Sequence, residues 1–383
     1  MPRSFRLIVS FLVLAVAAIT PVVLQAAGAP NPPFTLTWTQ GRCVKCQTAR
    51  ELAGVELLSE QEAWGIGYDP PGETGSGDYV IVHSRDGGET WRELPSTYQH
   101  NGAPAVSFSD KRSGWLTFFD MNSAEGRLLQ TNDGGIHWNR LPLRNRFFSA
   151  FQYLGQGTGY AVEFSPYKTP AHLLATRDYG QHWDSSPLPN DLKPGPMVFV
   201  NDRHGLLAGC VGHDTVIART FDRGRHWALT PLDLPPSGAA VNEGCGFEVD
   251  SLDLVDDQQG WLVVNQHVFG PDDNREFSAV YRTADGGSTW MQVFEESNPE
   301  SPQFFANLWF LNPRLGFIMK GIQSTGTQAF QEEIRWELLY TTDSGQTWQG
   351  TELPRAAGGC HQYHGGLACG SADFRLLKIS PRQ

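Results

Sequence analysis

Five carboxylates in the second half of the chain have the residue types that glycan hydrolysis requires. A glycosidase places two carboxyl groups about 5 to 9.5 Å apart, one to donate a proton and one to act as nucleophile or base. The candidates lie near segments that interrupt apolar strands: Glu243, Glu248, Asp250, Asp272 and Asp273. The sequence does not show that any two of them meet, so a glycan-active hydrolase is an alternative hypothesis and not the first one.

Two groups of residues have the types that redox or metal chemistry uses. Cys43 and Cys46 have CxxC spacing, but no His follows them as in a haem attachment site, and no βαβ pattern surrounds them. The second group resembles metal-ligand spacing only loosely; its members are Cys360, His361, His364 and Cys369. We therefore expect no metal and no other cofactor.

Six further aspartates recur in one pattern: Ser or Thr, any residue, Asp, any residue, Gly, two residues, Trp. The copies are Ser84–Trp91, Thr131–Trp138, Thr176–Trp183, Thr220–Trp227, Thr283–Trp290 and Thr341–Trp348. Their aspartates are Asp86, Asp133, Asp178, Asp222, Asp285 and Asp343. Asp can accept backbone hydrogen bonds in its own turn, Gly can adopt positive φ, and Trp can bury a large surface. We interpret each copy as a structural hairpin corner, because every aspartate has a turn to stabilise.

A second signature precedes each corner, and the two together resemble a known family. An apolar strand, a polar turn and Gly lead into another apolar strand, as in Val106–Phe118, Leu252–Val264 and Leu308–Lys320. The chain resembles the Asp-box (bacterial neuraminidase repeat) propellers, most of all those like photosystem II assembly factors. The resemblance implies an all-β fold, a single β-propeller of about seven four-stranded blades, six of them with Asp-box hairpins.

The two ends of the chain are expected to complete the last blade together. Leu367–Ser380 supplies strands but no box, and Phe34–Gln40 reads as a lone strand that fits as the missing outer one. A ring closed by both termini leaves no open sheet edge between its first and last blades. Six or eight blades remain alternatives at this point.

The first residues predict an export signal. Arg3 and Arg6 precede an apolar run from Leu7 to Val23, and small residues follow. Pro21 and the short run argue against a permanent membrane span. We expect residues 1–29 to form a signal peptide with an uncertain cleavage point, and residues 30–383 to form one domain. The protein is then periplasmic, lumenal or extracellular.

Export predicts that the six cysteines form three disulfides. Cys210 and Cys245 fall on the same face of adjacent blades, which makes their bond the most secure expectation. The remaining cysteines are expected to pair as Cys43–Cys46 and Cys360–Cys369, with an exchange between these two pairs left open. The formal net charge of −12 argues against nucleic acid and anionic membranes as main partners.

The long insertions are all expected on the face opposite the boxes, where loops on a rigid scaffold usually carry binding. They include Pro70–Asp78, Leu232–Gly246, His267–Phe277 and Gly321–Glu333. The candidate binding residues are Phe269, Asp272, Asp273, Arg275, Phe277, Phe330, Glu332 and Glu333.

The first functional hypothesis is an exported, monomeric, non-enzymatic propeller that binds or helps assemble another envelope or membrane protein. The alternative is a glycan-active hydrolase, closer to xyloglucanases than to sialidases. No Phe-Arg-Ile-Pro segment of the sialidase kind follows the signal. Xyloglucanases pair two propellers around a cleft, whereas this chain has room for one. A receptor domain like that of sortilin is a third hypothesis.

Overall fold

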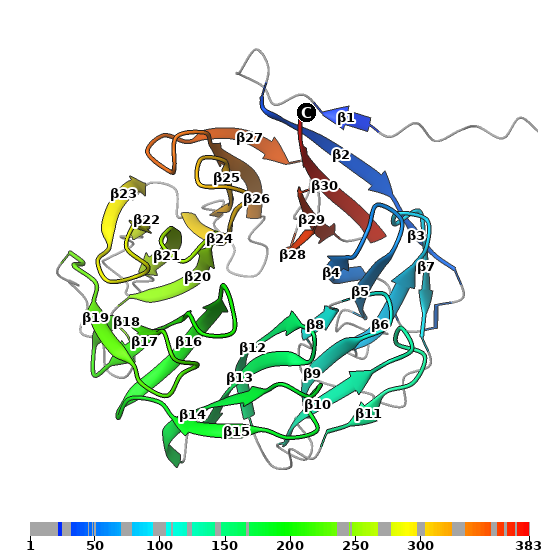
Figure 1. Ribbon diagram of the computed structural model, residues 1–383. Helices are drawn as coiled ribbons and strands as arrows, with labels where there is room; N and C mark the ends of the chain where they lie inside the picture. Colours follow the sequence, from blue (N-terminus) through cyan, green and yellow to red (C-terminus); the bar gives the residue numbers. More distant parts are fainter. Residues whose placement is uncertain are drawn as a thin grey trace, which may run out of the picture.

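Seven β-sheets stand in a ring around a central axis in a computed structural model of the chain (Figure 1). The structure describes residues 22–24, 32–44, 46–47, 49, 51–69, 79–94, 105–108, 110–120, 125–141, 147–165, 168–235, 245, 247–266, 277–296, 303–323, 334–353, 358–363, 366–371 and 374–382. The fold is a seven-bladed β-propeller, which confirms the predicted fold class and the preferred number of blades.

Each blade is a meander of four strands, called A to D from the axis outward. Blade 1 has β4 (Glu51–Leu57), β5 (Ala63–Tyr68), β6 (Tyr79–Ser84) and β7 (Thr90–Glu93). Blade 2 has β8 (Ala105–Phe108), β9 (Gly114–Asp120), β10 (Glu125–Thr131) and β11 (Asn139–Arg140). Blade 3 has β12 (Phe147–Gly155), β13 (Thr158–Ser165), β14 (Lys168–Thr176) and β15 (Asp184–Pro187). Blade 4 has β16 (Leu192–Phe199), β17 (Gly205–Val211), β18 (Asp214–Thr220) and β19 (Ala228–Pro231).

The remaining blades follow the same order. Blade 5 has β20 (Glu248–Leu254), β21 (Gly260–Gln266), β22 (Phe277–Thr283) and β23 (Met291–Glu296). Blade 6 has β24 (Gln303–Phe310), β25 (Gly316–Gln323), β26 (Ile334–Thr341) and β27 (Gln349–Leu353). Blade 7 has β28 (Gly358–Tyr363), β29 (Gly366–Ser371), β30 (Arg375–Pro381) and β2 (Phe34–Gln40), with β1 (Val22–Leu24) outside β2.

Burial along the strands follows from their place in the ring. Strand B lies between two neighbouring blades, so both of its faces are covered and it reads as a nearly continuous apolar run. In β21, Gly260 to Asn265 are all buried. Strand D lies at the perimeter and is short and exposed, as in β15. Short outer strands also limit unwanted edge pairing with other chains.

The ring is closed by the strand that the sequence assigns to this role. β2 pairs antiparallel with β30 along its whole length, from Phe34 opposite Pro381 to Gln40 opposite Arg375. The side chains of Phe34, Leu36 and Trp38 are buried in the core between blades 6 and 7. β1, which pairs with the outer edge of β2, lies within the predicted signal, so the signal peptide and its cleavage stay predictions.

A second short strand covers the outer edge of blade 1. β3 (Arg42–Cys43) pairs parallel with β7, and the Val44 N–H donates to the Trp91 carbonyl over 2.7 Å. The chain therefore crosses from the closing strand of blade 7 to the edge of blade 1 before it enters β4. Among the described residues, no helix has the length and apolar character needed to cross a bilayer.

Candidate binding surfaces

The box corners share one hydrogen-bond geometry, which Asp285 illustrates. Its Oδ1 accepts from the Thr283 hydroxyl and from the Thr289 N–H, both over 2.9 Å. Its Oδ2 accepts from the Thr289 hydroxyl over 2.7 Å. The Thr283 hydroxyl also accepts from the Gly287 N–H over 2.8 Å. Both carboxylate oxygens are thus used within the corner, and the other five corners repeat the pattern.

The residue four positions after each aspartate divides the corners into two kinds. Thr occupies it in blades 1, 5 and 6, whereas His occupies it in blades 2, 3 and 4, where the imidazole Nδ1 contacts the carboxylate. Hydrogen bonds from the His182 backbone and imidazole lower the pKa of Asp178 to about 2. A carboxylate with a depressed pKa stabilises the fold above its unfolded pKa of about 3.9. That contribution is lost as the pH falls toward 2.

The corners and the turns between strands A and B lie on the same face, which we call the box face. In blade 5 the Gly286 N–H donates to the Gln258 carbonyl of the A–B turn over 2.8 Å. Equivalent bonds join corner and turn in the other boxed blades, such as Tyr179 N–H to the Gly157 carbonyl over 3.1 Å. The opposite face, which carries the B–C connections and the links between blades, is the insertion face.

Replacing Asp285 by Ala is expected to lower the free energy of unfolding by about 1 kcal/mol. The hydrogen-bonded Thr289 N–H is exposed, so water can replace part of what the carboxylate supplies. Chemical denaturation of both proteins measures the difference. Asp285→Asn keeps one oxygen acceptor and is expected to lose less. A loss of several kcal/mol would show that the corner holds the blades together beyond its own turn.

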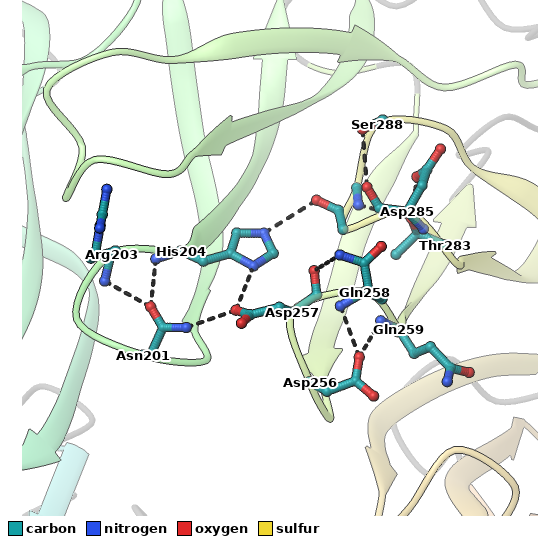
Figure 2. Close-up of polar contacts among 12 residues, drawn as sticks. Asn201, Arg203, His204, Asp256, Asp257, Gln258, Gln259, Thr283, Asp285 and Ser288 are labelled. Carbon is teal, nitrogen blue, oxygen red and sulfur yellow. Dashed lines mark hydrogen bonds and ion pairs between the residues drawn. The ribbon is translucent and has the colours of Figure 1, made fainter.

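Blades 4 and 5 are joined on the box face through a buried histidine (Figure 2). His204 Nδ1 lies 3.2 Å from Asp257 Oδ1, and its Nε2 lies 3.2 Å from the Gly286 carbonyl oxygen. Asn201 Nδ2 donates to the same Asp257 oxygen over 2.7 Å. Both partners of the ring are acceptors, so whichever ring nitrogen carries a proton can donate to the oxygen beside it. No sequence motif predicts the contacts of His204 with Asp257 and Gly286.

Tryptophans at the start of strand B make similar bonds from one blade to the next. Trp64 Nε1 donates to the Gly134 carbonyl in the blade 2 corner over 3.3 Å. Trp261 Nε1 donates to the Ser344 carbonyl in the blade 6 corner over 2.9 Å. The corners of blades 2, 5 and 6 therefore each bind a side chain of the preceding blade, which ties neighbouring blades together on the box face.

The described disulfides include one near the insertion face of blade 4 and one at the outer edge of blade 1. A disulfide joins Cys210, at the end of strand B in blade 4, to Cys245 in the link that leads to blade 5, which confirms the expected pair. A disulfide also joins Cys43 to Cys46. Cys369 is disulfide-bonded as well, while the side chain of Cys360 lies outside the described residues. None of the described cysteines is free.

Titration of the unreduced, denatured protein with a thiol reagent is expected to detect no thiol. The Cys210 side chain is buried and Cys245 reaches it from the neighbouring link, so the bond forms within the folded chain. Peptide mapping without reduction is expected to recover these two cysteines in one linked fragment. Two or more reactive thiols, or a map that separates Cys210 from Cys245, would contradict the assignment.

The connections on the two faces differ in length. On the box face, the A–B turn of blade 5 runs only from Leu254 to Gly260. On the insertion face, the B–C connections of blades 5 and 6 run from Gln266 to Phe277 and from Gln323 to Ile334. The link from Pro231 to Glu248 opens on the same face. These longer connections therefore all lie on the insertion face of the propeller.

Most of the predicted binding residues lie outside the described residues: Phe269, Asp272, Asp273, Arg275, Phe330, Glu332 and Glu333, together with Glu243. Phe277 is described; its ring packs edge-on against Phe247 at 5.6 Å and is half-buried in the core of blade 5. Glu248 is exposed at the start of β20. Asp250 accepts from the Asn307 N–H of blade 6 over 3.2 Å.

An ion-pair network that sequence reasoning missed lies near the bases of the two long B–C connections. Lys320, in strand B of blade 6, is buried and contacts the Glu296 carboxylate of blade 5. Its Nζ also lies 3.8 Å from Glu337, which in turn pairs with Arg335 at 3.3 Å. A lysine inside the otherwise apolar segment GFIMKGIQ is the signal that could have predicted a buried ion pair.

No three metal-binding side chains converge among the described residues. No family model matches the chain, and no curated protein is similar to it in sequence. Membership of the Asp-box family therefore stays a resemblance.

Several solved structures are similar to the chain in fold. YCF48 from Cyanidioschyzon merolae is 15% identical with a TM-score of 0.54, over 90% of this chain and 99% of that one. A PL25 ulvan lyase is 12% identical with a TM-score of 0.51, over 88% of this chain and 94% of that one. Drosophila Semaphorin 2a is 8% identical with a TM-score of 0.51, over 90% of this chain and 77% of that one. At these identities the similarity shows the β-propeller fold alone.

Proposed function

We propose that the chain is an exported, non-enzymatic propeller whose insertion face binds or helps assemble another envelope or membrane protein. The observation that carries the proposal is the difference between the two faces. Six tight, internally bonded corners leave the box-face backbone little freedom, whereas the connections Gln266–Phe277 and Gln323–Ile334 add length to adjacent blades on the opposite face. Variable loops on a rigid scaffold are where proteins usually place binding residues.

Bonds between strands and links support the rigidity of that face. The disulfide from Cys210 to Cys245 ties the link between blades 4 and 5 to a buried strand. The contact of Lys320 with Glu296 joins blades 5 and 6 between the two long connections. A preorganised platform lowers the entropy that binding must offset. Disulfides are also typical of proteins outside the cytosol, in accord with the predicted export.

Shortening both long connections is expected to remove partner binding and leave the fold intact. The variant replaces residues 267–276 and 324–333 by tight turns and keeps the flanking strands. Affinity capture from the native envelope, with the unaltered protein as bait, identifies the partner, and the purified pair is then measured directly. A matched control shortens residues 70–78 of blade 1. Unchanged partner affinity in the double-loop variant would place binding elsewhere on the propeller.

The alternative hypothesis, a glycan-active hydrolase, predicts turnover of a glycan. The described carboxylates that lie together near the long connections, Glu296 and Glu337, share Lys320. Their contacts with Lys320 engage both carboxylates within the fold, whereas a glycosidase needs one carboxyl group placed to protonate the glycosidic oxygen. Purified protein is therefore expected to turn over neither polysaccharides nor aryl glycosides. Turnover that falls about 10²-fold on substitution of Asp272, Asp273, Glu243 or Glu248 would overturn the proposal.

A further inference from the structure

Apolar side chains stand in water at three consecutive corners of the box face. Ile136 in blade 2 is 54% exposed, Tyr179 in blade 3 is 40% exposed and Phe221 in blade 4 is 47% exposed. The other large exposed hydrophobic side chains of the described residues lie on strands and not at corners: Leu229, Met291 and Ile334. Exposed apolar groups gathered in one sector often mark an interaction surface.

Tyr179 occupies a backbone position that glycine occupies more easily. The residue after the box aspartate has positive φ, and Gly87, Gly134 and Gly286 fill it in blades 1, 2 and 5. The other three corners have a non-glycine residue there: Tyr179 with a φ of 61° in blade 3, Arg223 with 72° in blade 4 and Ser344 with 67° in blade 6. Arg223 is bound to Asp202, which accounts for its side chain. The Tyr179 ring lies against Gly157 of the A–B turn and keeps 40% of its surface exposed, so a partner could contact the exposed part while the turn holds the ring in place.

The same sector presents cations on a chain that is acidic overall. Arg177, Arg203 and Arg225 are exposed on the box face of blades 3 and 4. Arg177 lies 3.9 Å from the exposed Asp184 carboxylate, so its charge is partly balanced. Within the described residues, the side chains of Arg203 and Arg225 have no ion pair with a carboxylate, and Figure 2 shows Arg203 turned away from His204 and Asp257. The box carboxylates point into their corners, where N–H, hydroxyl and imidazole groups bind them. The sector thus offers outward positive charge, while the formal net charge of the chain is −12.

We propose that this box-face rim, defined by Ile136, Arg177, Tyr179, Arg203, Phe221 and Arg225, binds an acidic protein surface. Tyr, Phe and Arg are enriched in protein interfaces, and opposite charge aligns and accelerates encounter. The propeller then has two binding faces, as an assembly factor that joins two partners needs. The rim does not depend on the insertion face, so either proposal stands without the other.

The details of the rim favour a protein over a glycan or a membrane. Phe221 is already stacked on His204 at 4.3 Å, and the Arg219 guanidinium lies over its ring at 5.2 Å. This ring is therefore poorly placed to stack on a sugar. An anionic bilayer would contact the whole box face, including the exposed carboxylate of Glu89 in blade 1 and that of Glu60, which lies 3.7 Å from the Lys378 ammonium. Repulsion there limits the ligand to a surface that covers only blades 2 to 4.

The test measures binding of the full chain to a short fluorescein-labelled peptide in which Glu alternates with Tyr and Gly. Anisotropy is expected to show binding that weakens as salt is added. Arg177→Glu combined with Arg225→Glu is expected to weaken it at least about tenfold. The matched control reverses two exposed cations outside the rim, Lys193 and Arg314, and is expected to change affinity less than about twofold.

Tyr179→Gly separates binding from stability. Glycine relieves the positive φ but removes the contact of the ring with Gly157, so the variant is expected to melt close to the unaltered protein while its affinity for the peptide falls. The loop-shortened protein is expected to bind the peptide normally. The proposal would be overturned if reversing Lys193 and Arg314 lowered the affinity for the peptide as much as reversing the rim arginines. It would also be overturned if a peptide with Lys in place of Glu bound equally well. A protein that binds phosphatidylglycerol vesicles or heparin through the rim residues, and does not bind the acidic peptide, would also overturn it.

Discussion

Replacing Trp261 by Ala is expected to lower the free energy of unfolding by about 3 to 5 kcal/mol. The side chain is 0% exposed and stacks on Phe310 of the next blade at 3.6 Å between ring centroids. Its Nε1 donates to the Ser344 carbonyl, which would lose this bond. The substitution therefore removes packing and a hydrogen bond between blades 5 and 6 at once. Urea denaturation monitored by circular dichroism measures the loss.

The matched comparison is Trp290→Ala in the corner of the same blade. Trp290 is half-buried at the start of the outer strand, so its loss is expected to cost only about 1 to 2 kcal/mol. Trp261→Phe keeps an aromatic ring against Phe310 but loses the indole N–H and part of the ring volume, so its loss of stability is expected to fall between the two. Equal losses for Trp261→Ala and Trp290→Ala would mean that contact between blades contributes little to stability.

The sequence predicts those parts of the fold that local signals specify. In each corner, the hydroxyl of Thr283 or its equivalent, the aspartate and the glycine bond to one another within a few residues, so the motif carries its own geometry. Alternation of apolar and polar residues in Phe34–Gln40 likewise identifies a strand with one buried face. The C-terminal repeat lacked one such strand, its outer one. Counting blades and closing the ring therefore needed no knowledge of distant contacts.

Contacts between blades could not be predicted in this way. Lys320 with Glu296 and His204 with Gly286 each join residues from different repeats, and no spacing specifies such a pair. The burial of tryptophans shows the same limit. The sequence favours the box tryptophans as large buried groups, yet Trp290 is half-buried because strand D lies at the perimeter. Trp261 is fully buried because strand B lies between blades.

Removing β2 is expected to abolish the stable fold. Phe34, Leu36 and Trp38 are buried between blades 6 and 7, and each such side chain contributes about 1.5 to 3 kcal/mol. Their sum is comparable with the whole stability of a typical protein, about 5 to 15 kcal/mol. The loss also unpairs β30 along its length and exposes an apolar sheet edge, which promotes aggregation.

A chain that begins at Gln40 tests this against a matched chain that begins at Pro30 and keeps β2. The longer chain is expected to elute as a monomer and to melt cooperatively. The shorter one is expected to aggregate or to melt without a cooperative transition, because Phe317 and Tyr340 of blade 6 lose their contacts with Phe34 at 5.0 and 4.8 Å. A peptide spanning residues 32–41, added in excess, is expected to restore the transition in part. A shorter chain that melts like the longer one would show that the first six blades and the C-terminal strands hold the ring without closure.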